Sequence, residues 1–247
     1  MEFEVIAHRG FSAIAPENTL AAFSSALREG ADSIELDLQL SADGIPVVIH
    51  DETLERIAGK PDKVRETPIA VLQGLDVGAW FGDRFAGERI PTFSQVLAAI
   101  ASLPKHLYLD VKPHCDWSDR QIDDLLALLL REGWETRCII SSFNESFVNR
   151  VRQRNYNFTL GYIVADADSY QQELAKAASA RNTVMISLYK ILLANPQLVE
   201  ASDRAGVEIV AWTVDDPDIV RQLGELGVKR IVTNRLVGQI NSNLTQN

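Results

Sequence analysis

The chain has 247 residues, of which 46% are hydrophobic and 23% charged, values typical of a globular protein and unlike those of disordered or collagen-like chains. Its formal net charge of -10 argues against a nucleic-acid partner or an anionic membrane, because there is no excess of Lys and Arg to release counterions. No apolar run in the sequence approaches the roughly 18 residues of a membrane span.

Short apolar runs alternate with longer amphipathic segments along the whole chain. The short runs are rich in Val, Ile and Leu, and the long segments repeat their apolar residues at helical spacing. This alternation predicts a parallel sheet whose strands are joined by helices. The expected strands span residues 3–7, 33–38, 107–111, 138–141, 159–163, 184–188, 208–212 and 230–232.

Helices are expected between these strands. Several begin near Ser, Thr, Asp or Asn, which cap helix N-termini. Gly30, Gly133, Gly206 and Gly227 follow expected helix ends, where a left-handed cap favours glycine. The helices span residues 19–29, 92–102, 119–132, 145–154, 169–180, 196–205 and 217–226, and residues 239–247 are expected to form a frayed helix or tail.

The number of strands favours an α/β fold of the TIM type, a (β/α)8 barrel, over an open doubly wound sheet. Such a barrel commonly uses about 250 residues around one core, so we expect residues 1–247 to form a single domain. The first strand is not followed by G-x-G-x-x-G, which also argues against a dinucleotide-binding fold.

Residues 51–91 interrupt the alternation with many Gly, Pro and charged residues and little helical periodicity beyond residues 69–74. We expect a small insertion after the second strand region, folded over one end of the barrel. Its aromatic residues Trp80, Phe81 and Phe85 either pack the insertion against the barrel or line a substrate entrance, and packing is the commoner role of such residues.

Polar residues gather where several expected strands end. In a parallel barrel the C-terminal strand ends meet on one face, and that face carries the chemistry. Two of the strands carry polar residues two positions apart, so that both side chains of each pair point to the same side. The residues are His8 and Arg9, Glu35 and Asp37, His50 after the apolar run 46–49, and Asp110 with Lys112.

Each of these residues alone has an ordinary structural explanation, such as a helix cap or a salt bridge at the rim. Glu35 and Asp37 are harder to explain in this way, because they lie in an apolar strand where unpaired carboxylates are costly to bury. A bound cation would remove that cost. Oxygen ligands alone favour Mg²⁺ or Ca²⁺, whereas ligation by His8 or His50 would favour Zn²⁺, Mn²⁺ or Fe²⁺.

Four motifs together resemble those of the glycerophosphodiester phosphodiesterase family, within the phospholipase C-like phosphodiesterase superfamily. They are His8-Arg9-Gly10, Pro16-Glu17-Asn18-Thr19, Glu35-Leu36-Asp37 and His50-Asp51. Segments 75–81, 87–92, 212–214 and 231–234 are also similar to family motifs, so the resemblance covers essentially the whole chain. It implies a catalytic TIM-type barrel that hydrolyses glycerophosphodiesters to an alcohol and sn-glycerol 3-phosphate, usually with a divalent cation.

The resemblance also implies roles for residues at matching positions. His8 and His50 match the catalytic acid/base pair, although the sequence leaves open which is the base. Glu35 and Asp37 match ligands of one divalent cation, Mg²⁺ or Ca²⁺ with Mn²⁺ as a further candidate, and Asp110 stands at the third ligand position.

On the substrate side, Arg9 matches a phosphate-binding arginine. Glu17 and Lys112 match polar positions of the family's active site, and Trp212 lies in a matching late motif where it would wall the pocket. The implied partner is therefore a small glycerophosphodiester.

Three residues depart from the family pattern. Asp110 replaces a glutamate that is usual at the third ligand position, which shortens the side chain by one methylene, about 1.5 Å. Asn234 stands where aspartate is usual, and Asp215 stands where asparagine is common. These departures concern the details of the site more than the class of reaction.

Two alternative functions compete with this interpretation. One is a phosphodiesterase acting on lysophospholipids or phosphoinositides, which a large apolar groove formed by the insertion would favour. The other is a non-catalytic glycerophosphodiester-binding protein that has lost turnover through Asp110 and the altered late motif. Head-group preference and oligomeric state do not follow from the sequence.

The N-terminus and the cysteines favour a cytoplasmic protein. The first four residues include two acids and lead straight into a strand-like run, unlike a secretory signal peptide. Cys115 and Cys138 show neither C-x-x-C nor zinc-ribbon spacing, which argues against a disulfide framework or a structural zinc site. We therefore expect a reducing compartment.

Overall fold

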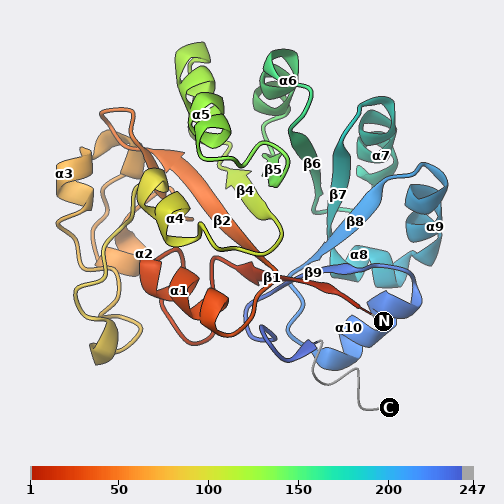
Figure 1. Ribbon diagram of the computed structural model, residues 1–247, viewed down its shortest axis with the longest axis horizontal. Coiled ribbons are helices and arrows are strands. Elements are labelled where there is room, and N and C mark those ends of the chain that lie inside the picture. The colour runs from red at the N-terminus through yellow and green to blue at the C-terminus, as the bar shows by residue number, and fades with distance from the viewer. Residues whose placement is uncertain (1, 241–247) are drawn as a thin grey trace.

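Eight parallel strands close into a barrel in the computed structural model, which describes residues 2–240 (Figure 1). Their order is β1-β9-β8-β7-β6-β5-β4-β2, and the pairing of β2 with β1 closes the barrel. The predicted TIM-type fold is confirmed, with small differences at the strand ends. The strands are β1 (Glu4–His8), β2 (Ser33–Leu40), β4 (Leu107–Val111), β5 (Cys138–Ser141), β6 (Thr159–Val164), β7 (Thr183–Leu188), β8 (Glu208–Trp212) and β9 (Arg230–Thr233).

The apolar run at residues 46–49 forms a further strand that was not expected. This strand, β3 (Pro46–Val48), pairs antiparallel with β2, so that Val48 lies opposite Leu38. The chain thus turns back along the C-terminal half of β2 before it enters the insertion. As a result, the residues that follow β3 lie beside the C-terminal ends of the barrel strands.

The helices surround the barrel in Figure 1. Thr92 and Ser118 form capping boxes at two helix starts, and the glycines expected after helix ends all have positive φ. The expected helices are α1 (Leu20–Arg28), α4 (Phe93–Ala99), α5 (Asp119–Arg131), α6 (Glu145–Arg154), α7 (Tyr170–Ser179), α9 (Pro196–Arg204) and α10 (Pro217–Glu225). An additional helix, α8 (Tyr189–Ala194), directly follows β7. Residues 241–247 of the expected tail lie outside the described residues.

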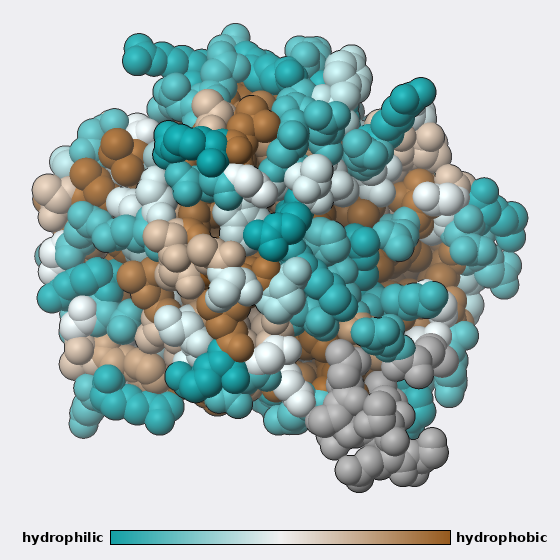
Figure 2. Space-filling model, viewed as in Figure 1, coloured by the Kyte–Doolittle hydropathy of each residue, from teal (hydrophilic) through white to brown (hydrophobic). Residues whose placement is uncertain are grey.

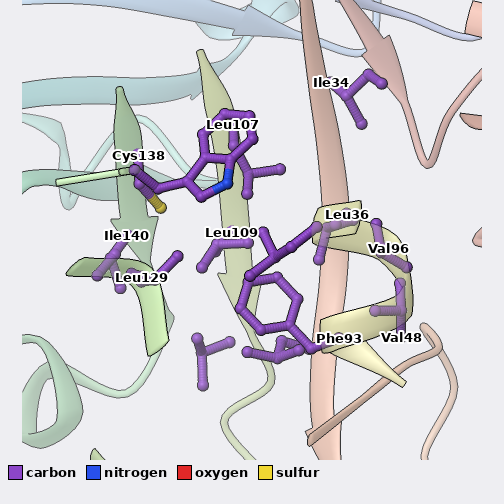
Figure 3. Packing of buried hydrophobic residues seen from close by; sticks show 14 of the residues in the cluster. Ile34, Leu36, Val48, Phe93, Val96, Leu107, Leu109, Leu129, Cys138 and Ile140 are labelled. Atoms are coloured by element: carbon purple, nitrogen blue, oxygen red, sulfur yellow. The ribbon is translucent and has the colours of Figure 1, made fainter. Parts of the chain in front are cut away.

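Side chains alternate between the inside and the outside of the barrel wall. On β2, Ile34, Leu36 and Leu38 face outward, and Figure 3 shows Leu36 beside Phe93 and Val96 of α4. The inward-facing apolar residues of several strands meet in a separate central cluster, to which Ile6, Tyr108, Ile139, Val184, Val210 and Val232 belong. This period of two explains why residues such as Glu35 and Asp37 point into the barrel.

The insertion, residues 51–91, has a small apolar core of its own. It contains the short helices α2 (Glu55–Ala58) and α3 (Ile69–Leu72) and the 3-10 turns η1 (Val64–Glu66) and η2 (Asp83–Phe85). Its buried residues, among them Leu54, Val64 and Leu72, pack with Val47 and Ile49 at the end of β3. The insertion is therefore anchored to the strand that leads to His50.

The aromatic residues of the insertion contact one another. Phe81 lies edge to face with both Trp80 and Phe85, at 5.5 Å between ring centroids in each case. Trp80 is 47% exposed, so burial against the barrel does not account for it.

On the face shown in Figure 2, hydrophobic side chains form small areas separated by hydrophilic ones. Within residues 2–240, no helix has the length and hydropathy needed to cross a membrane.

The N-terminal end of the barrel is closed by a polar cluster around the buried carboxylate of Glu4. Ser33 donates to Glu4 Oε1 over 2.6 Å, and His106 Nδ1 lies 2.8 Å from the same atom. Tyr108 also donates to Oε1, and Arg230 Nε lies 3.3 Å from Oε2. His106, which directly precedes β4, therefore lies at the end of the barrel opposite His8 and His50.

Candidate active site

A cavity of about 190 Å³ opens at the C-terminal ends of the barrel strands. One side is polar and is formed mainly by β1, β2, β4 and the segment after β3. The other side, formed by β6 to β9 and the loop after β5, is largely apolar. The lining residues are His8, Arg9, Glu35, Asp37, His50, Tyr108, Asp110, Lys112, Ser141, Phe143, Ile163, Ile186, Val210, Trp212 and Val232.

The register of the strands brings the polar side chains together. His8 of β1 lies opposite Glu35 of β2, and Asp37 of β2 lies opposite Asp110 of β4. Neighbouring strands are about 4.8 Å apart, so side chains that face the same way at these positions become close neighbours. The alternation seen in the sequence and the pairing of the strands together produce the cluster.

Glu35, Asp37 and Asp110 form a group that could hold a metal ion. One carboxylate oxygen from each residue lies within 4.8 Å of the others. Asp110 Oδ1 is buried and has no hydrogen-bond partner, an arrangement that is costly unless another ligand binds there. Burial, together with the charge of Asp37, raises the pKa of Glu35 well above its ordinary range. Three oxygen donors fit a hard divalent cation.

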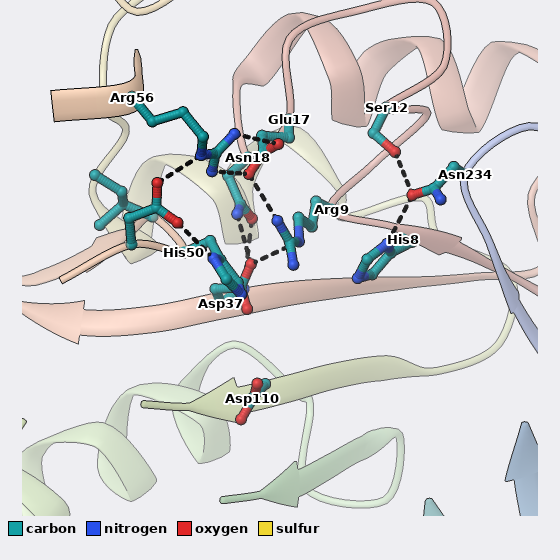
Figure 4. A network of polar contacts seen from close by, with 12 residues as sticks. His8, Arg9, Ser12, Glu17, Asn18, Asp37, His50, Arg56, Asp110 and Asn234 are labelled. Atoms are coloured by element: carbon teal, nitrogen blue, oxygen red, sulfur yellow. Dashed lines mark hydrogen bonds and ion pairs between the residues drawn. The ribbon is translucent and has the colours of Figure 1, made fainter. Parts of the chain in front are cut away.

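Two basic side chains lie against the same carboxylates. Lys112 Nζ is 2.6 Å from Asp37 Oδ1 and 2.7 Å from Asp110 Oδ2. Arg9 Nε is 3.2 Å from Asp37 Oδ2 (Figure 4). Burial alone would lower the pKa of Lys112, but the charges of Asp37 and Asp110 outweigh burial and raise it. Both groups are therefore cationic at neutral pH and can neutralise a bound anion.

The turn after β1 fixes the position of Arg9. Arg9 has a φ of 56°, in the left-handed region that few residues other than glycine adopt. Its backbone N–H donates to Glu35 Oε2 over 3.0 Å. Gly10 follows with a φ of 80°, and a Cβ there would lie 2.7 Å from the backbone of Ala22. The glycine of the His-Arg-Gly motif is thus required by the close approach of α1.

Glu17 lies beside the cavity and is not among the residues that line it. Its Oε1 accepts a hydrogen bond from Arg9 NH1 over 2.8 Å, and both of its oxygens accept bonds from Arg56. Next to it, Asn18 donates from Nδ2 to Asp37 Oδ2 over 2.7 Å. The Pro-Glu-Asn-Thr motif therefore does not line the cavity itself, but its Glu17 and Asn18 hold Arg9 and Asp37 in position.

His8 is held by the two residues that depart from the family pattern in the late strands. His8 Nδ1 lies 2.7 Å from Asn234 Oδ1. Asn234 donates through Nδ2 to Asp215 Oδ2, also over 2.7 Å, and through its backbone N–H to Asp215 Oδ1. Because the Asp215 carboxylate can only accept, the amide oxygen of Asn234 must face the ring. His8 Nδ1 is then the donor, and Nε2 is left on the side of Glu35, at 3.8 Å.

His50 is positioned by the segment that leaves β3. The backbone N–H of Ile49 donates to Asp37 O over 3.0 Å. Gln39 Nε2 donates to the carbonyl oxygens of Ile49, His50 and Asp51. His50 Nδ1 lies 2.7 Å from Asp51 Oδ1, so the Asp51 carboxylate fixes Nδ1 as the donor and leaves Nε2 free for other partners.

The two histidines have different electrostatic surroundings. Burial, helped by the nearby charge of Arg9, lowers the pKa of His8 to about 4. His8 is therefore neutral at pH 7, with its lone pair on Nε2. His50 is more exposed and has a carboxylate, not an amide, behind its ring. The sequence shows two equivalent histidines, whereas the structure distinguishes them.

On the apolar side, Trp212 donates from Nε1 to Ile186 O over 3.2 Å, which holds the indole in the cavity wall. Phe143, in the loop after β5, is 51% exposed and also lines the cavity. His114 does not line it and instead lies with Nε2 2.9 Å from Gln39 Oε1.

The structure thus gathers His8, Arg9, Glu35, Asp37, His50, Asp110, Lys112 and Trp212 around one cavity. Three further residues support the site although no role was predicted for them: Asn18 and Asp51, which lie within the family-like motifs, and Arg56. Arg56 comes from the insertion and gave no sequence signal, because its partner Glu17 is 39 positions away and its contact with the nearby Asp51 depends on how the insertion folds.

Comparisons with known proteins agree with this geometry. The model of the Glycerophosphoryl diester phosphodiesterase family matches residues 8–237. A glycerophosphodiester phosphodiesterase of Caldanaerobacter subterraneus subsp. tengcongensis is 34% identical over 236 residues, which cover 95% of both chains.

Solved structures are similar over the whole fold. An Oleispira antarctica phosphodiesterase, solved in complex with the product sn-glycerol-3-phosphate, has a TM-score of 0.88 and 29% identity, over 98% of this chain and 97% of its own. A glycerophosphodiester phosphodiesterase of Agrobacterium tumefaciens is also 29% identical, with a TM-score of 0.80, over 98% of this chain and all of its own.

Proposed function

Because the chain belongs to the glycerophosphoryl diester phosphodiesterase family, we propose that it hydrolyses glycerophosphodiesters by metal-assisted acid/base catalysis with His8 and His50. The enzyme is a glycerophosphodiester phosphodiesterase, and the products are an alcohol and sn-glycerol 3-phosphate. The observation that carries the proposal is the convergence of two imidazoles, three carboxylates and two cationic side chains on one cavity.

Glu35, Asp37 and Asp110 would hold one divalent cation, Mg²⁺ or Ca²⁺, with Mn²⁺ as a third candidate. The unpartnered Asp110 Oδ1 and the all-oxygen donor set support this assignment. When bound, such a cation supplies charge that polarises a phosphoryl oxygen. Arg9 and Lys112 lie beside the same carboxylates and would bind the remaining anionic oxygens of the phosphate.

His8 is proposed as the general base. Its ring is neutral at pH 7, and Nε2 is the nitrogen that carries the lone pair. This nitrogen takes the proton of the attacking hydroxyl as the new bond between oxygen and phosphorus forms. The hydroxyl belongs either to water or to the substrate's own glycerol, and ³¹P NMR of the first product separates direct hydrolysis from a cyclic phosphate.

His50 is proposed as the general acid. The Asp51 carboxylate lies 2.7 Å from its Nδ1, which orients the ring and leaves Nε2 available to the substrate. His50 Nε2 then donates a proton to the alcohol oxygen as the bond between that oxygen and phosphorus breaks. In direct hydrolysis, His8 then loses its proton to solvent and His50 takes one up. With a cyclic phosphate, the second water gives its proton to His50 as it attacks, and His8 returns its proton to the glycerol oxygen as that bond to phosphorus breaks, so that each turnover restores both rings.

Glu17 is proposed to act on the phosphate through Arg9, which it holds over 2.8 Å. Trp212 and Phe143 would lie against the less polar part of the substrate. The cavity, at about 190 Å³, is smaller than the roughly 300–1,000 Å³ of pockets for drug-sized ligands. This size favours a compact water-soluble diester over a lipid substrate.

The lysophospholipid alternative depends on an apolar groove formed by the insertion. Among the residues that the structure describes, none between 51 and 91 lines the cavity. The binding-protein alternative depends on a damaged site, whereas both histidines and all three carboxylates face the cavity. Hydrolysis of a small diester is the function that these observations favour.

The experiment is to measure release of sn-glycerol 3-phosphate from glycerophosphocholine and glycerophosphoethanolamine after EDTA treatment. Mg²⁺, Ca²⁺ and Mn²⁺ are then added back separately. Release that a metal restores would support the proposal and identify the usable cation, and release unaffected by EDTA would contradict metal dependence. If neither diester is cleaved, lysophospholipids are tested next, and binding without cleavage of any of them would favour the binding-protein function.

We further propose that residues 1–247 act as a single catalytic domain in the cytoplasm. Two free, buried cysteines, Cys115 and Cys138, are suited to a reducing compartment. A single cooperative unfolding transition and recovery of the enzyme in the cytosolic fraction of its native cells are the expected results.

A further inference from the structure

One side chain of the insertion reaches the polar network of the cavity. Arg56 of α2 donates from Nε to Asp51 Oδ2 over 2.6 Å. It also donates from NH1 and NH2 to the two oxygens of Glu17, over 2.9 Å and 2.8 Å. Figure 4 shows the guanidinium group of Arg56 beside Glu17, with dashed lines for their contacts.

Each of these carboxylates supports a residue that lines the cavity. Asp51 Oδ1 is 2.7 Å from His50 Nδ1, and Glu17 Oε1 is 2.8 Å from Arg9 NH1. Arg56 thus connects Asp51, which contacts His50, with Glu17, which contacts Arg9. Glu17 follows β1 and Asp51 follows β3, so Arg56 connects two loops that are 34 positions apart in the sequence.

The backbone around Arg56 is well anchored. Leu54, at the start of α2, is 1% exposed and belongs to the apolar core of the insertion. Its N–H donates to Asp62 O, and its carbonyl oxygen accepts from Ala58 N. Gly59 ends the helix with a φ of 66°. The core of the insertion therefore fixes the backbone from which Arg56 extends, and the two carboxylates fix its guanidinium group.

The contacts require the shape of a guanidinium group. Its planar fork can meet both oxygens of one carboxylate and keep a third N–H for another. A lysine ammonium supplies the same charge as a single point and cannot span both carboxylates in this way. The side chain is 44% exposed, so charge alone would contribute little here.

We propose that Arg56 is a positioning residue that orients His50 through Asp51 and Arg9 through Glu17, so that the insertion completes the active site. The inference rests on the proposed function, because it assigns a purpose to the support of His50 and Arg9. It also gives the insertion a task other than forming a substrate groove.

The test compares Arg56→Gln and Arg56→Lys with Arg65→Gln. Arg65 is a matched control, since it is another insertion arginine and its carboxylate partner, Asp116, is exposed and 3.8 Å away. We expect Arg56→Gln to lower kcat about 10- to 100-fold, the range found when residues that orient ligands are removed. KM should rise by a smaller factor, because Arg9 keeps its direct hydrogen bond to Glu17 and only the second support of that carboxylate is lost. The kcat of Arg56→Lys should lie between those of Arg56→Gln and the wild type. The kcat of Arg65→Gln should equal that of the wild type.

A double-mutant cycle separates positioning from general stability. In an Asp51→Asn background, Arg56→Gln should lower kcat by less than about 3-fold. The reason is that the Asp51 carboxylate, through which Arg56 orients His50, is already absent. An equal loss in both backgrounds, or a wild-type kcat in Arg56→Gln, would overturn the inference. If Arg56→Gln fails to fold, Arg56→Lys is taken through the same cycle.

A second readout does not depend on turnover. Ring ¹⁵N NMR of His50 should show a protonated Nδ1 in the wild type and a changed or broadened signal in Arg56→Gln, with little change in Arg65→Gln. If Arg56→Gln leaves both the His50 signals and the rates unchanged, the positioning role of Arg56 is rejected and the proposed function is not affected. Turnover that survives His50→Ala would instead reject the proposed function, so the two failures can be told apart.

Discussion

The Nδ1 of His8 lies 2.7 Å from Oδ1 of Asn234, an amide whose other end is held by Asp215. The family usually has the acid and the amide in the reverse positions. Here the segments after β8 and β9 are joined by two hydrogen bonds from Asn234 to Asp215, and a neutral oxygen faces the histidine. The effect at Nδ1 is that a neutral oxygen, and not a carboxylate, orients the His8 ring.

This exchange predicts non-additive mutations. Asn234→Asp alone places a second carboxylate opposite Asp215, and the two charges repel each other within a network that leaves no cation between them. We expect kcat/KM to fall at least ~10-fold, a loss of about 1.4 kcal/mol or more of transition-state stabilisation. The double variant Asp215→Asn/Asn234→Asp restores the pairing and should recover most of the activity. Equal activities in the single and double variants would contradict this account.

The two-histidine proposal predicts that neither ring is dispensable. His8→Ala and His50→Ala should each reduce kcat by roughly 10²–10⁴-fold, the contribution of a positioned acid or base. His106→Ala is the control, because His106 lies at the other end of the barrel, with Nδ1 2.8 Å from Glu4 Oε1. Circular dichroism should show a folded barrel in all three variants. A near-wild-type rate in either of the first two would refute the scheme.

The low pKa of His8 predicts activity in mildly acidic solution. Burial and Arg9 lower this pKa from 6.5 to about 4, and a base must be neutral to accept a proton. The acid limb of kcat/KM should therefore lie near pH 4, with activity retained between pH 4 and 6.5. In Asp215→Asn/Asn234→Asp, the carboxylate at position 234 stabilises the protonated ring and should move this limb to higher pH. A wild-type limb at 6.5 would be incompatible with a buried His8 base.

The acidic cluster predicts a strong effect of Asp110 on metal affinity. Asp110→Asn removes one charge from the three proposed ligands and should raise the metal concentration for half-maximal activity at least ~10-fold. Asp110→Glu restores the residue that is usual in the family and should keep activity while changing the ranking of Mg²⁺, Ca²⁺ and Mn²⁺. Asp116→Asn, at an exposed carboxylate next to the insertion, serves as the control. Equal metal dependence in Asp110→Asn and the control would exclude Asp110 as a ligand.

Sequence alone predicted the elements whose patterns are local. The β-then-α alternation gave the barrel, and the two-residue spacing of Glu35 and Asp37 placed both carboxylates on the inner face. Helix ends followed from glycines, because a positive φ is a property of a single position.

The parts that sequence missed depend on contacts between distant residues. The antiparallel return of β3 is set by its pairing with β2, and no local signal distinguishes it from a parallel strand. Likewise, Arg56 resembles any exposed helical arginine until Glu17 and Asp51 are brought beside it. For Glu17, the motif predicted a place on the substrate side of the site, and the contacts of its oxygens with two arginines could not be seen from the sequence.

The cluster at the other end of the barrel predicts a specific loss of stability in acid. Burial alone would raise the pKa of Glu4, but hydrogen bonds from His106 and Ser33 and the charge of Arg230 outweigh it and lower the pKa to about 2. Since the unfolded value is 4.5, the ionised form stabilises the fold fully above pH 4.5. This stabilisation is lost as the pH falls from 4.5 toward 2, and it amounts to roughly 3 kcal/mol.

Urea unfolding of wild type and Glu4→Gln as a function of pH measures this contribution. The difference in the free energy of unfolding should be large at neutral pH and shrink steadily between pH 4.5 and pH 2. Glu208→Gln is the control, because Glu208 also pairs with Arg230, over 2.6 Å, but is 68% exposed. It should change stability by less than ~1 kcal/mol, since an exposed ion pair is well screened. A difference between wild type and Glu4→Gln that does not vary with pH would mean that packing, and not the charge of Glu4, holds this end of the barrel together.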